Sequence, residues 1–322
     1  MPNPDNSQRL PIVTIGGFLG AGKTTLVNHI LQSPNQGRTV VFVNDFGAIN
    51  IDYSQIETVE ADRISLKNGC VCCSLNDDFV ASVADFAREF EPPDLVVVEA
   101  SGVADPRALD ASLDALEGAG LTQLDARVYV LDADNFDSFD FEHKEQAIDH
   151  AAASDLIVLN KTDVATNAQI FEIDALLAES APYSKILKTS YGDVDTKLLL
   201  GVRSDSDFRH SDTALPAARA SSSHTDKYVH WSFETERYLD KAAFEIFAQF
   251  LPTICLRAKG FIRFLDQCDT VFVFNLVGHR ATLEPARNAT KVQNSQIIAI
   301  GEMGTLIPKE LSQEFKKTLI GI

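Results

Sequence analysis

The strongest constraint on the fold is an alternation of short apolar runs with helical stretches over the first 200 residues. The runs are rich in Val, Ile and Leu, as in strands that are buried on both faces of a parallel sheet. Helical patterns lie between them, and this order predicts a doubly wound, mostly parallel α/β sheet, whose ligands bind at the carboxyl ends of strands. The runs are "PIVTIGGF", "TVVFVND", "DLVVVEAS", "ARVYVLDA" and "DLIVLNKTD".

The sequence pattern changes after residue 200. Residues 201–226 are polar, with serine clusters and no clean period, which is typical of a linker or a mobile insertion. Residues 227–322 return to strand-like runs with two helix candidates, a pattern that predicts a smaller α+β domain. We therefore expect one domain over residues 1–200, a linker over 201–226 and a second domain over 227–322.

The net charge argues against two classes of binding partner. The formal net charge is −18, and such an acidic chain repels nucleic acid backbones and anionic membranes, so neither is expected as a partner. Apolar runs stay well short of the roughly 20 residues that span a bilayer, and the polar start lacks the pattern of a secretory signal. These features predict a cytoplasmic protein, in which thiols stay reduced.

A glycine-rich stretch predicts a phosphate site. "GGFLGAGKTT" contains Gly17, Gly22, Lys23 and Thr24 in the spacing G-x-x-x-x-G-K-[ST], directly after a strand pattern and at the start of a helix pattern. Glycines let backbone N–H groups turn toward phosphate oxygens, and the helix adds its positive N-terminal end. We expect Lys23 to reach the β- and γ-phosphates and the Thr24 hydroxyl to bind Mg²⁺.

Two further motifs complete a guanine nucleotide site. Asn160, Lys161 and Asp163 form the pattern N-K-x-D after a strand, and a carboxylate such as Asp163 accepts hydrogen bonds from the guanine N1–H and 2-amino group. Adenine presents a different edge, so the motif favours GTP and GDP. The later stretch "KTSYGD" would place Ser190 near the base.

An acidic residue at a strand end predicts the second Mg²⁺ contact. Glu99 ends the apolar strand "DLVVVEASG" and fits the Walker B role, in which an acid holds Mg²⁺ directly or through water. Gly102 follows, and its backbone N–H could approach the γ-phosphate.

A cysteine cluster is the third chemical feature. Cys70, Cys72 and Cys73 stand within four positions of a chain that has five cysteines. Thiolates suit Zn²⁺ and Co²⁺, and three of them leave a fourth coordination position open, as a carrier requires. A buried structural cluster and a redox-active or nucleophilic cysteine are the alternatives. Cys255 and Cys268 lie in apolar strand contexts and are expected in the core.

Together these motifs resemble those of the CobW-type (CobW/HypB/UreG) GTPases, which are SIMIBI-class P-loop proteins. The resemblance covers essentially the whole chain, and residues 227–322 are similar to the family's C-terminal domain. It implies a P-loop GTPase domain over residues 1–200 and a metallochaperone that delivers Zn²⁺ or Co²⁺ to a client metalloprotein, and it leaves open a nucleotide- or metal-dependent homodimer. The motifs are "GGFLGAGKTT", "VNDFGAINID", "NGCVCCSL", "VVVEASGVADP", "NKTD" and "TSYGDVD".

The resemblance also implies the site residues. We expect slow intrinsic turnover, because neither an arginine finger nor a catalytic glutamine is evident in the sequence. "NDFG" stands where the family usually has Asn-Glu-Phe-Gly, with Ala48 in place of a second acid, and this departure weakens a ligand or water-positioning role for Asp45. The implied sets are Lys23, Asp45, Glu99 and Gly102 for catalysis; Gly17, Gly20, Ala21, Gly22, Lys23, Thr24, Thr25, Asn160, Lys161, Asp163 and Ser190 for the nucleotide; Thr24 and Glu99 for Mg²⁺; and Cys70, Cys72 and Cys73 for the transition metal.

Two other functions fit parts of the pattern. A regulatory GTPase switch or assembly factor would bind GTP and a protein without delivering metal, and metal titration separates it from a carrier. A P-loop kinase for a small molecule is the second alternative, and the N-K-x-D motif argues against it.

Overall fold

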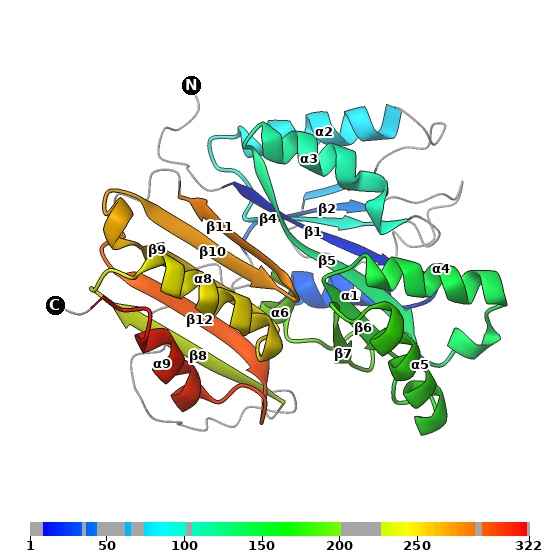
Figure 1. Cartoon of the computed structure of the whole chain (residues 1–322). Coiled ribbons are helices and arrows are strands. Elements are labelled where there is room, and N and C mark those ends of the chain that lie inside the picture. The colour runs from blue at the N-terminus through cyan, green and yellow to red at the C-terminus, as the bar shows by residue number, and fades with distance from the viewer. Residues whose placement is uncertain are drawn as a thin grey trace. The chain divides into compact units, whose positions relative to one another are not determined.

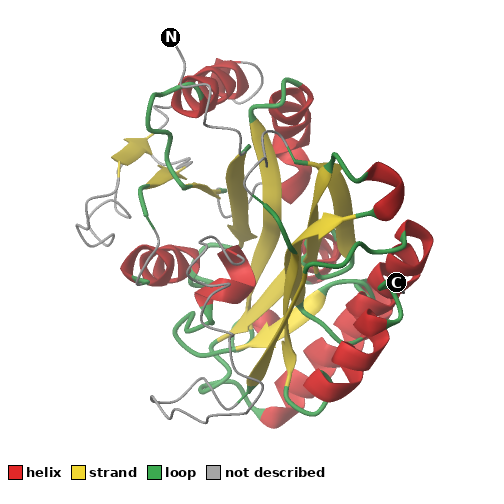
Figure 2. Cartoon of the chain, turned by 90° about the vertical axis from the view of Figure 1, so that its left-hand side faces the viewer, coloured by secondary structure: helices red, strands yellow, loops and turns green. Residues whose placement is uncertain are grey.

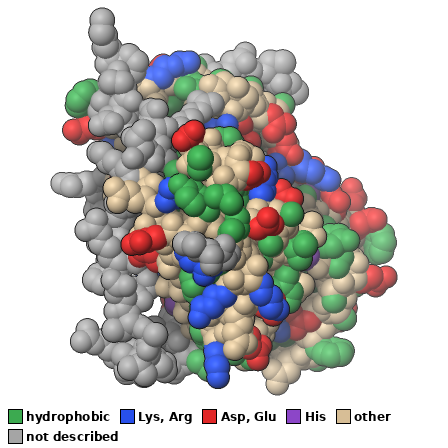
Figure 3. All heavy atoms as spheres, turned by 60° about the vertical axis from the view of Figure 1, so that its left-hand side comes forward, with side chains coloured by type: hydrophobic (Ala, Val, Ile, Leu, Met, Phe, Trp, Pro, Cys, Tyr) green, Lys and Arg blue, Asp and Glu red, His purple; other side chains and the backbone are tan. Residues whose placement is uncertain are grey.

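The computed structural model describes residues 9–33, 37–43, 62–65, 74–100, 105–200, 227–286 and 292–320. These residues divide into two compact units, one up to Leu199 and one from Leu200 onward (Figure 1). The expected linker, residues 201–226, lies outside the described residues. Among the described residues, no helix is both long and apolar enough to cross a membrane. Acidic and basic side chains are interspersed on the face shown in Figure 3.

The described part of the first unit contains a seven-stranded parallel sheet in the order β3-β2-β4-β1-β5-β6-β7 (Figure 1). The order reverses at β1, with β4 and β5 as its neighbours, and this reversal is where ligands bind in such sheets. The predicted doubly wound sheet is confirmed. The strands are β1 (Leu10–Gly17), β2 (Thr39–Val43), β3 (Asp62–Ser65), β4 (Leu95–Glu99), β5 (Thr122–Asp132), β6 (Leu156–Asn160) and β7 (Lys185–Lys188).

Helices cover the sheet because its central strands are apolar on both faces. Every residue of β2, β4 and β6 is buried. One apolar cluster joins α2 and α3 to β1, β2 and β4, a second joins α4 and α5 to β5 and β6, and α1 contacts β1 and β4. The helices are α1 (Lys23–Gln32), α2 (Ser74–Ala87), α3 (Asp110–Gly118), α4 (Phe141–Ala152), α5 (Asn167–Ser180) and α6 (Thr196–Leu200), with short 3₁₀ turns η2 (Pro106–Leu109) and η3 (Phe136–Ser138).

The second unit is the expected smaller α+β domain. Its described strands form a five-stranded antiparallel sheet in the order β11-β10-β9-β12-β8, and α8 and α9 lie side by side on it (Figures 1 and 2). Asp240 caps α8 by accepting a hydrogen bond from the Ala243 N–H at 2.8 Å. The elements are β8 (Tyr228–Thr235), α8 (Lys241–Phe250), η4 (Leu251–Thr253), β9 (Arg257–Arg263), η5 (Leu265–Gln267), β10 (Val271–Val277), β11 (Arg280–Pro285), β12 (Ser295–Glu302) and α9 (Pro308–Lys316).

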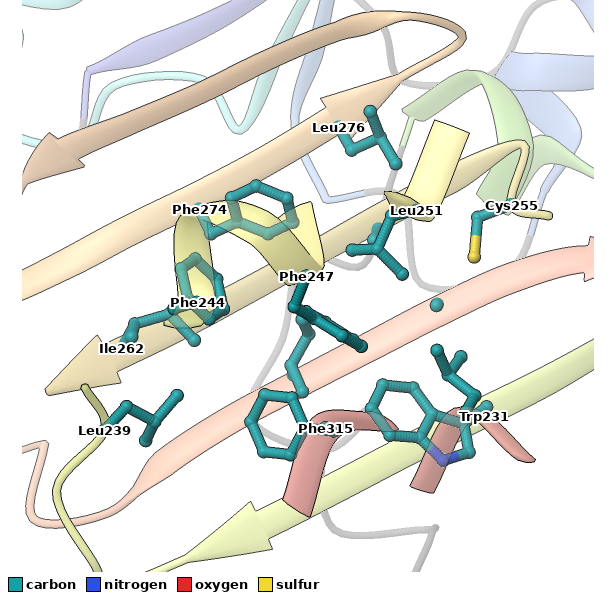
Figure 4. Packing of buried hydrophobic residues seen from close by; sticks show 14 of the residues in the cluster. Trp231, Leu239, Phe244, Phe247, Leu251, Cys255, Ile262, Phe274, Leu276 and Phe315 are labelled. Carbon is teal, nitrogen blue, oxygen red and sulfur yellow. The ribbon is translucent and has the colours of Figure 1, made fainter. Parts of the chain in front are cut away.

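Aromatic side chains fill the core between α8, α9 and this sheet (Figure 4). Phe244 is fully buried, with ring centroids 5.3 Å from Phe274 and 5.6 Å from Phe264. Trp231, 4% exposed, lies 5.8 Å from Phe315 between ring centroids. Such rings contribute through buried area and through edge-to-face contact.

The two cysteines of this unit have different environments. Cys255 is buried in the aromatic core, as predicted. The prediction for Cys268 was wrong, because this residue is exposed. Cys268 directly follows η5 and precedes β10, which begins only at Val271, so it lies in a surface connection and not in the strand.

We expect Phe244→Ala to reduce the free energy of unfolding of the second unit by about 3–5 kcal/mol, because it removes a ring from a closely packed core. Trp231 is the only tryptophan of the chain, so its fluorescence during urea unfolding reports this unit. Ile246→Ala on the same helix is the control: Ile246 is 70% exposed, and its loss should change the free energy by no more than about 0.5 kcal/mol. Equal effects of the two substitutions would contradict the packing described.

Candidate functional site

The loop between β1 and α1 depends on glycine. Gly17, Gly20 and Gly22 have φ values of 141°, 78° and 106°, which L side chains rarely adopt. A Cβ on Gly17 would overlap the carbonyl oxygen of Val130, so glycine also allows the close approach of β1 to β5. The predicted phosphate loop therefore lies at the carboxyl end of β1, where the strand order reverses.

The Lys23 ammonium folds back over this loop. Its Nζ donates hydrogen bonds to the carbonyl oxygens of Gly17 at 2.9 Å and Phe18 at 3.1 Å, and the residue is 7% exposed. The Phe18 ring packs against the Phe139 ring, 4.9 Å away between centroids. The loop is thus held by the hydrogen bonds from Lys23 and by the packing of the Phe18 ring.

Thr24 and Glu99 meet across two elements. The Thr24 hydroxyl, in the first turn of α1, donates a hydrogen bond of 3.0 Å to Glu99 Oε1 at the end of β4. Glu99 is 5% exposed. A hydroxyl and a carboxylate in contact beside a phosphate loop fit the oxygen ligands that Mg²⁺ prefers. The two residues expected to hold Mg²⁺ are therefore brought together.

Asn160 joins the phosphate loop to the loop that follows β7. Its Nδ2 donates to the Ala21 carbonyl oxygen at 2.9 Å, and its Oδ1 accepts from the Gly192 N–H at 2.9 Å. Asn160 is 2% exposed, and a Cβ on Gly22 would overlap its Nδ2. This bridging contact was not foreseen from the sequence, although both loops carried predicted site residues.

The other residues predicted to bind the nucleotide lie in the loops after β6 and β7. Lys161 has a φ of 61° and forms an ion pair of 2.6 Å with Asp132 at the end of β5. Thr162 donates through its hydroxyl to the Thr189 carbonyl at 2.9 Å, which places Ser190 Oγ 3.5 Å from Thr162 Oγ1. Asp163 is exposed. The N-K-T-D motif and Ser190 are thus close together, and Asp132 is a contact that sequence reasoning missed.

Several predicted site residues cannot be placed. Asp45, Gly102 and the three metal candidates, Cys70, Cys72 and Cys73, lie outside the described residues, so their roles stay predictions. Among the residues that are described, no group of three or more His, Cys, Asp or Glu side chains could hold a metal ion.

An ion pair links the 3₁₀ turn η2 to α4. Asp105 caps η2 and accepts three hydrogen bonds from the Arg107 guanidinium, and these bonds lower the pKa of Asp105. Arg107 also pairs with Asp149 of α4 at 2.5 Å. The neighbouring His150 is 5% exposed, and its ring lies 5.9 Å from the Tyr129 ring. Burial lowers the pKa of His150.

The chain matches two families. Residues 11–188 match the nucleotide-binding domain described as CobW/HypB/UreG, and residues 228–319 match the C-terminal domain of the cobalamin synthesis protein CobW. The first match covers more than half of the chain. The chain therefore belongs to the CobW/HypB/UreG family of P-loop GTPases, and the resemblance expected from its motifs is confirmed.

Individual relatives carry metal-related names. The chain is 28% identical to the zinc chaperone CobW of Sinorhizobium sp over 290 residues, which are 80% of this chain and 82% of that protein. It is 30% identical to the zinc chaperone YjiA of Escherichia coli K12 over 200 residues, 59% of this chain and 60% of that protein. The solved structure of the Zn(II)-bound YjiA GTPase from E. coli is 22% identical, with 97% of this chain and 100% of that chain covered and a TM-score of 0.43.

Gly22→Ala tests the bridge at Asn160. We expect it to lower the melting temperature of the nucleotide-free protein by about 5 °C or more, because the new Cβ adds a clash with Asn160 to the cost of a positive φ. Gly20→Ala is the matched control: its φ is also positive, but nothing lies within 4 Å of the new Cβ. Thermal unfolding followed by circular dichroism compares the two, and a larger loss for Gly20→Ala would contradict the bridge.

His150 should make stability depend on pH. Because burial lowers its pKa below the ordinary value of 6.5, the unfolded chain binds the extra proton more readily than the folded one. The free energy of unfolding is therefore expected to fall as the pH is lowered through about 6.5, the pKa in the unfolded chain, toward the lower pKa of the folded state. Asp105 titrates below this window, because its pKa is lowered. In urea unfolding, the free energy of unfolding of His150→Phe should depend less on pH than that of the wild type. An unchanged pH dependence would contradict this role of His150.

Proposed function

We propose that this protein is a GTP-hydrolysing metallochaperone that binds Zn²⁺ or Co²⁺ through Cys70, Cys72 and Cys73 and delivers it to a client metalloprotein under nucleotide control. The observation that carries the nucleotide half is the contact of Thr24 with Glu99 at the phosphate loop. Family membership and the relatives named zinc chaperones support the metal half and favour zinc. We place the protein in the cytoplasm, where reducing conditions keep thiols available.

The nucleotide chemistry follows from the described side chains. Lys23 and the loop glycines would hold the phosphates, while Thr24 and Glu99 would hold Mg²⁺, which neutralises charge that develops on the phosphate oxygens. Asp163 would accept hydrogen bonds from guanine. It lies three residues after Asn160, whose side chain is hydrogen-bonded to Ala21 of the phosphate loop. The bound GTP would thus lie across the carboxyl ends of β1, β4 and β6.

The thiol motif stands between two elements of the same unit. In the sequence it follows β3, which pairs with β2, and α2 begins at Ser74, the residue after the motif. Segments that contact the γ-phosphate become ordered with GTP and relax on hydrolysis in many GTPases. We assign that behaviour to the segments with Asp45, the thiols and Gly102, so that hydrolysis changes the metal site.

Glu99→Gln separates the charge of the acid from its hydrogen bond with Thr24. The amide oxygen can still accept from the Thr24 hydroxyl, but the negative charge that attracts Mg²⁺ is lost. We expect Mg²⁺-dependent GTP hydrolysis to fall by about 10- to 100-fold, while GDP binding without Mg²⁺ stays at the wild-type level. Phosphate-release kinetics and a GDP titration check this prediction. Hydrolysis by the variant at the wild-type rate would rule out the Mg²⁺ role of Glu99.

The metal site is tested by replacing all three thiols. The variant with Cys70→Ser, Cys72→Ser and Cys73→Ser should lose tight stoichiometric Co²⁺ binding and the cobalt–thiolate absorption, because serine hydroxyls are poor ligands for these ions. Cys268→Ser is the matched control, since Cys268 is an exposed cysteine of the second unit, and it should bind like wild type. Unchanged metal affinity in the triple variant would end the proposal in favour of a GTPase switch or assembly factor.

A further inference from the structure

Asp132 is a buried carboxylate at the carboxyl end of β5, 4% exposed. Its Oδ1 accepts from the backbone N–H groups of Asp134 and Asn135, each at 3.1 Å. Its Oδ2 accepts from Asn135 Nδ2 at 2.8 Å and from Lys161 Nζ at 2.6 Å. Burial raises the pKa of Asp132, but the hydrogen bonds from Lys161 and Asn135 outweigh it, so the pKa is lowered and the group is charged.

Lys161 stands one residue beyond the strand ladder. Asp132 and Asn160 are the last paired residues of β5 and β6, and the positive φ of Lys161 belongs to the turn that follows. Its ammonium contacts the neighbouring strand end, so its methylene chain spans from the end of β6 to the end of β5. The adjacent Asn160 is bonded to the phosphate loop at Ala21. The lysine stem is thus fixed at the edge where the nucleotide is proposed to lie.

We propose that Asp132 is a positioning residue of the nucleotide site: it holds Lys161 in one extended conformation, so that the methylene stem forms a preset surface for the nucleoside half of GTP or GDP. This inference rests on the proposed nucleotide binding and extends it to a residue outside the N-K-T-D motif. A lysine that is already ordered loses less conformational entropy when the ligand binds. The Lys161 side chain remains 32% exposed in this ion pair and is therefore accessible to a ligand.

A purely structural role for Asp132 is the competing explanation, because three of its four hydrogen bonds lie within its own turn. Asp132→Asn separates the two roles. The amide oxygen can keep both Oδ1 bonds to the turn, whereas an NH₂ group would replace Oδ2 and face the Lys161 ammonium, donor against donor. The Asn135 side-chain amide can turn its oxygen toward the new NH₂. Asp134→Asn is the matched control, since Asp134 is an exposed carboxylate of the same turn.

The experiment measures the affinity of each variant for GDP, by titration with a fluorescent GDP analogue, and for inorganic pyrophosphate, by competition. We expect Asp132→Asn to weaken GDP binding about tenfold, because the Lys161 side chain is then free before binding and loses its conformational entropy only when the ligand binds. Pyrophosphate would contact only the phosphate loop, so its affinity should not change. Asp134→Asn should match wild type for both ligands.

Lys161→Met supplies a second measurement that does not disturb the Asp132 turn. Methionine keeps most of the apolar stem and removes the charge, so this variant should lose GDP affinity by a similar factor. If Asp132 acts through Lys161, adding Asp132→Asn to Lys161→Met should cause no further loss, because the two residues form one coupled pair.

The outcomes separate this inference from the proposed function. Equal weakening of GDP and pyrophosphate by Asp132→Asn, or additive losses in the double variant, would assign Asp132 to the turn alone and overturn the inference. Wild-type GDP affinity in both Asp132→Asn and Lys161→Met would also overturn it, while the proposed function stands. If wild-type protein binds no guanine nucleotide, the proposed function itself fails.

Discussion

The site depends on the two hydrogen bonds of the Asn160 side-chain amide. One bond holds the carbonyl of Ala21 in the phosphate loop and the other holds the N–H of Gly192 in the loop after β7, so one buried group sets the distance between two loops that are far apart in the sequence. The amide is satisfied in both directions, which makes its burial favourable and its removal costly. Gly22 belongs to the same contact, because a side chain there would displace Asn160.

The parallel sheet explains why these groups converge. Strands β4, β1, β5 and β6 are neighbours and end at the same edge. At this edge Glu99 ends β4, the glycine loop follows β1, Asp132 ends β5, and Asn160 ends β6 with Lys161 directly after it. Because each strand is buried and paired, its terminal residue has little freedom, and the geometry of the edge follows from the core.

The sequence predicted those parts of the site that a local pattern defines. The phosphate loop, Glu99 and the N-K-T-D motif each combine a buried strand with particular residues directly after it, and this combination also identified both the parallel sheet and the family. Contacts between distant segments were not predictable in this way. Asp132 lies 29 residues before Lys161, and nothing in the N-K-T-D motif refers to it. Cys268 was wrongly predicted to lie in the core, because β10 begins only at Val271, three residues after it.

We propose that the bound nucleotide controls the affinity of the protein for metal. The most direct measurement is the Zn²⁺ affinity of the full chain, by competition with a chromogenic chelator, once with Mg²⁺ and a non-hydrolysable GTP analogue and once with Mg²⁺ and GDP. We predict one tight Zn²⁺ site per chain whose affinity differs between the two states by about tenfold or more, which corresponds to a coupling free energy of at least about 1.4 kcal/mol. Equal Zn²⁺ affinity in the two states would contradict nucleotide control and leave two independent sites on one chain.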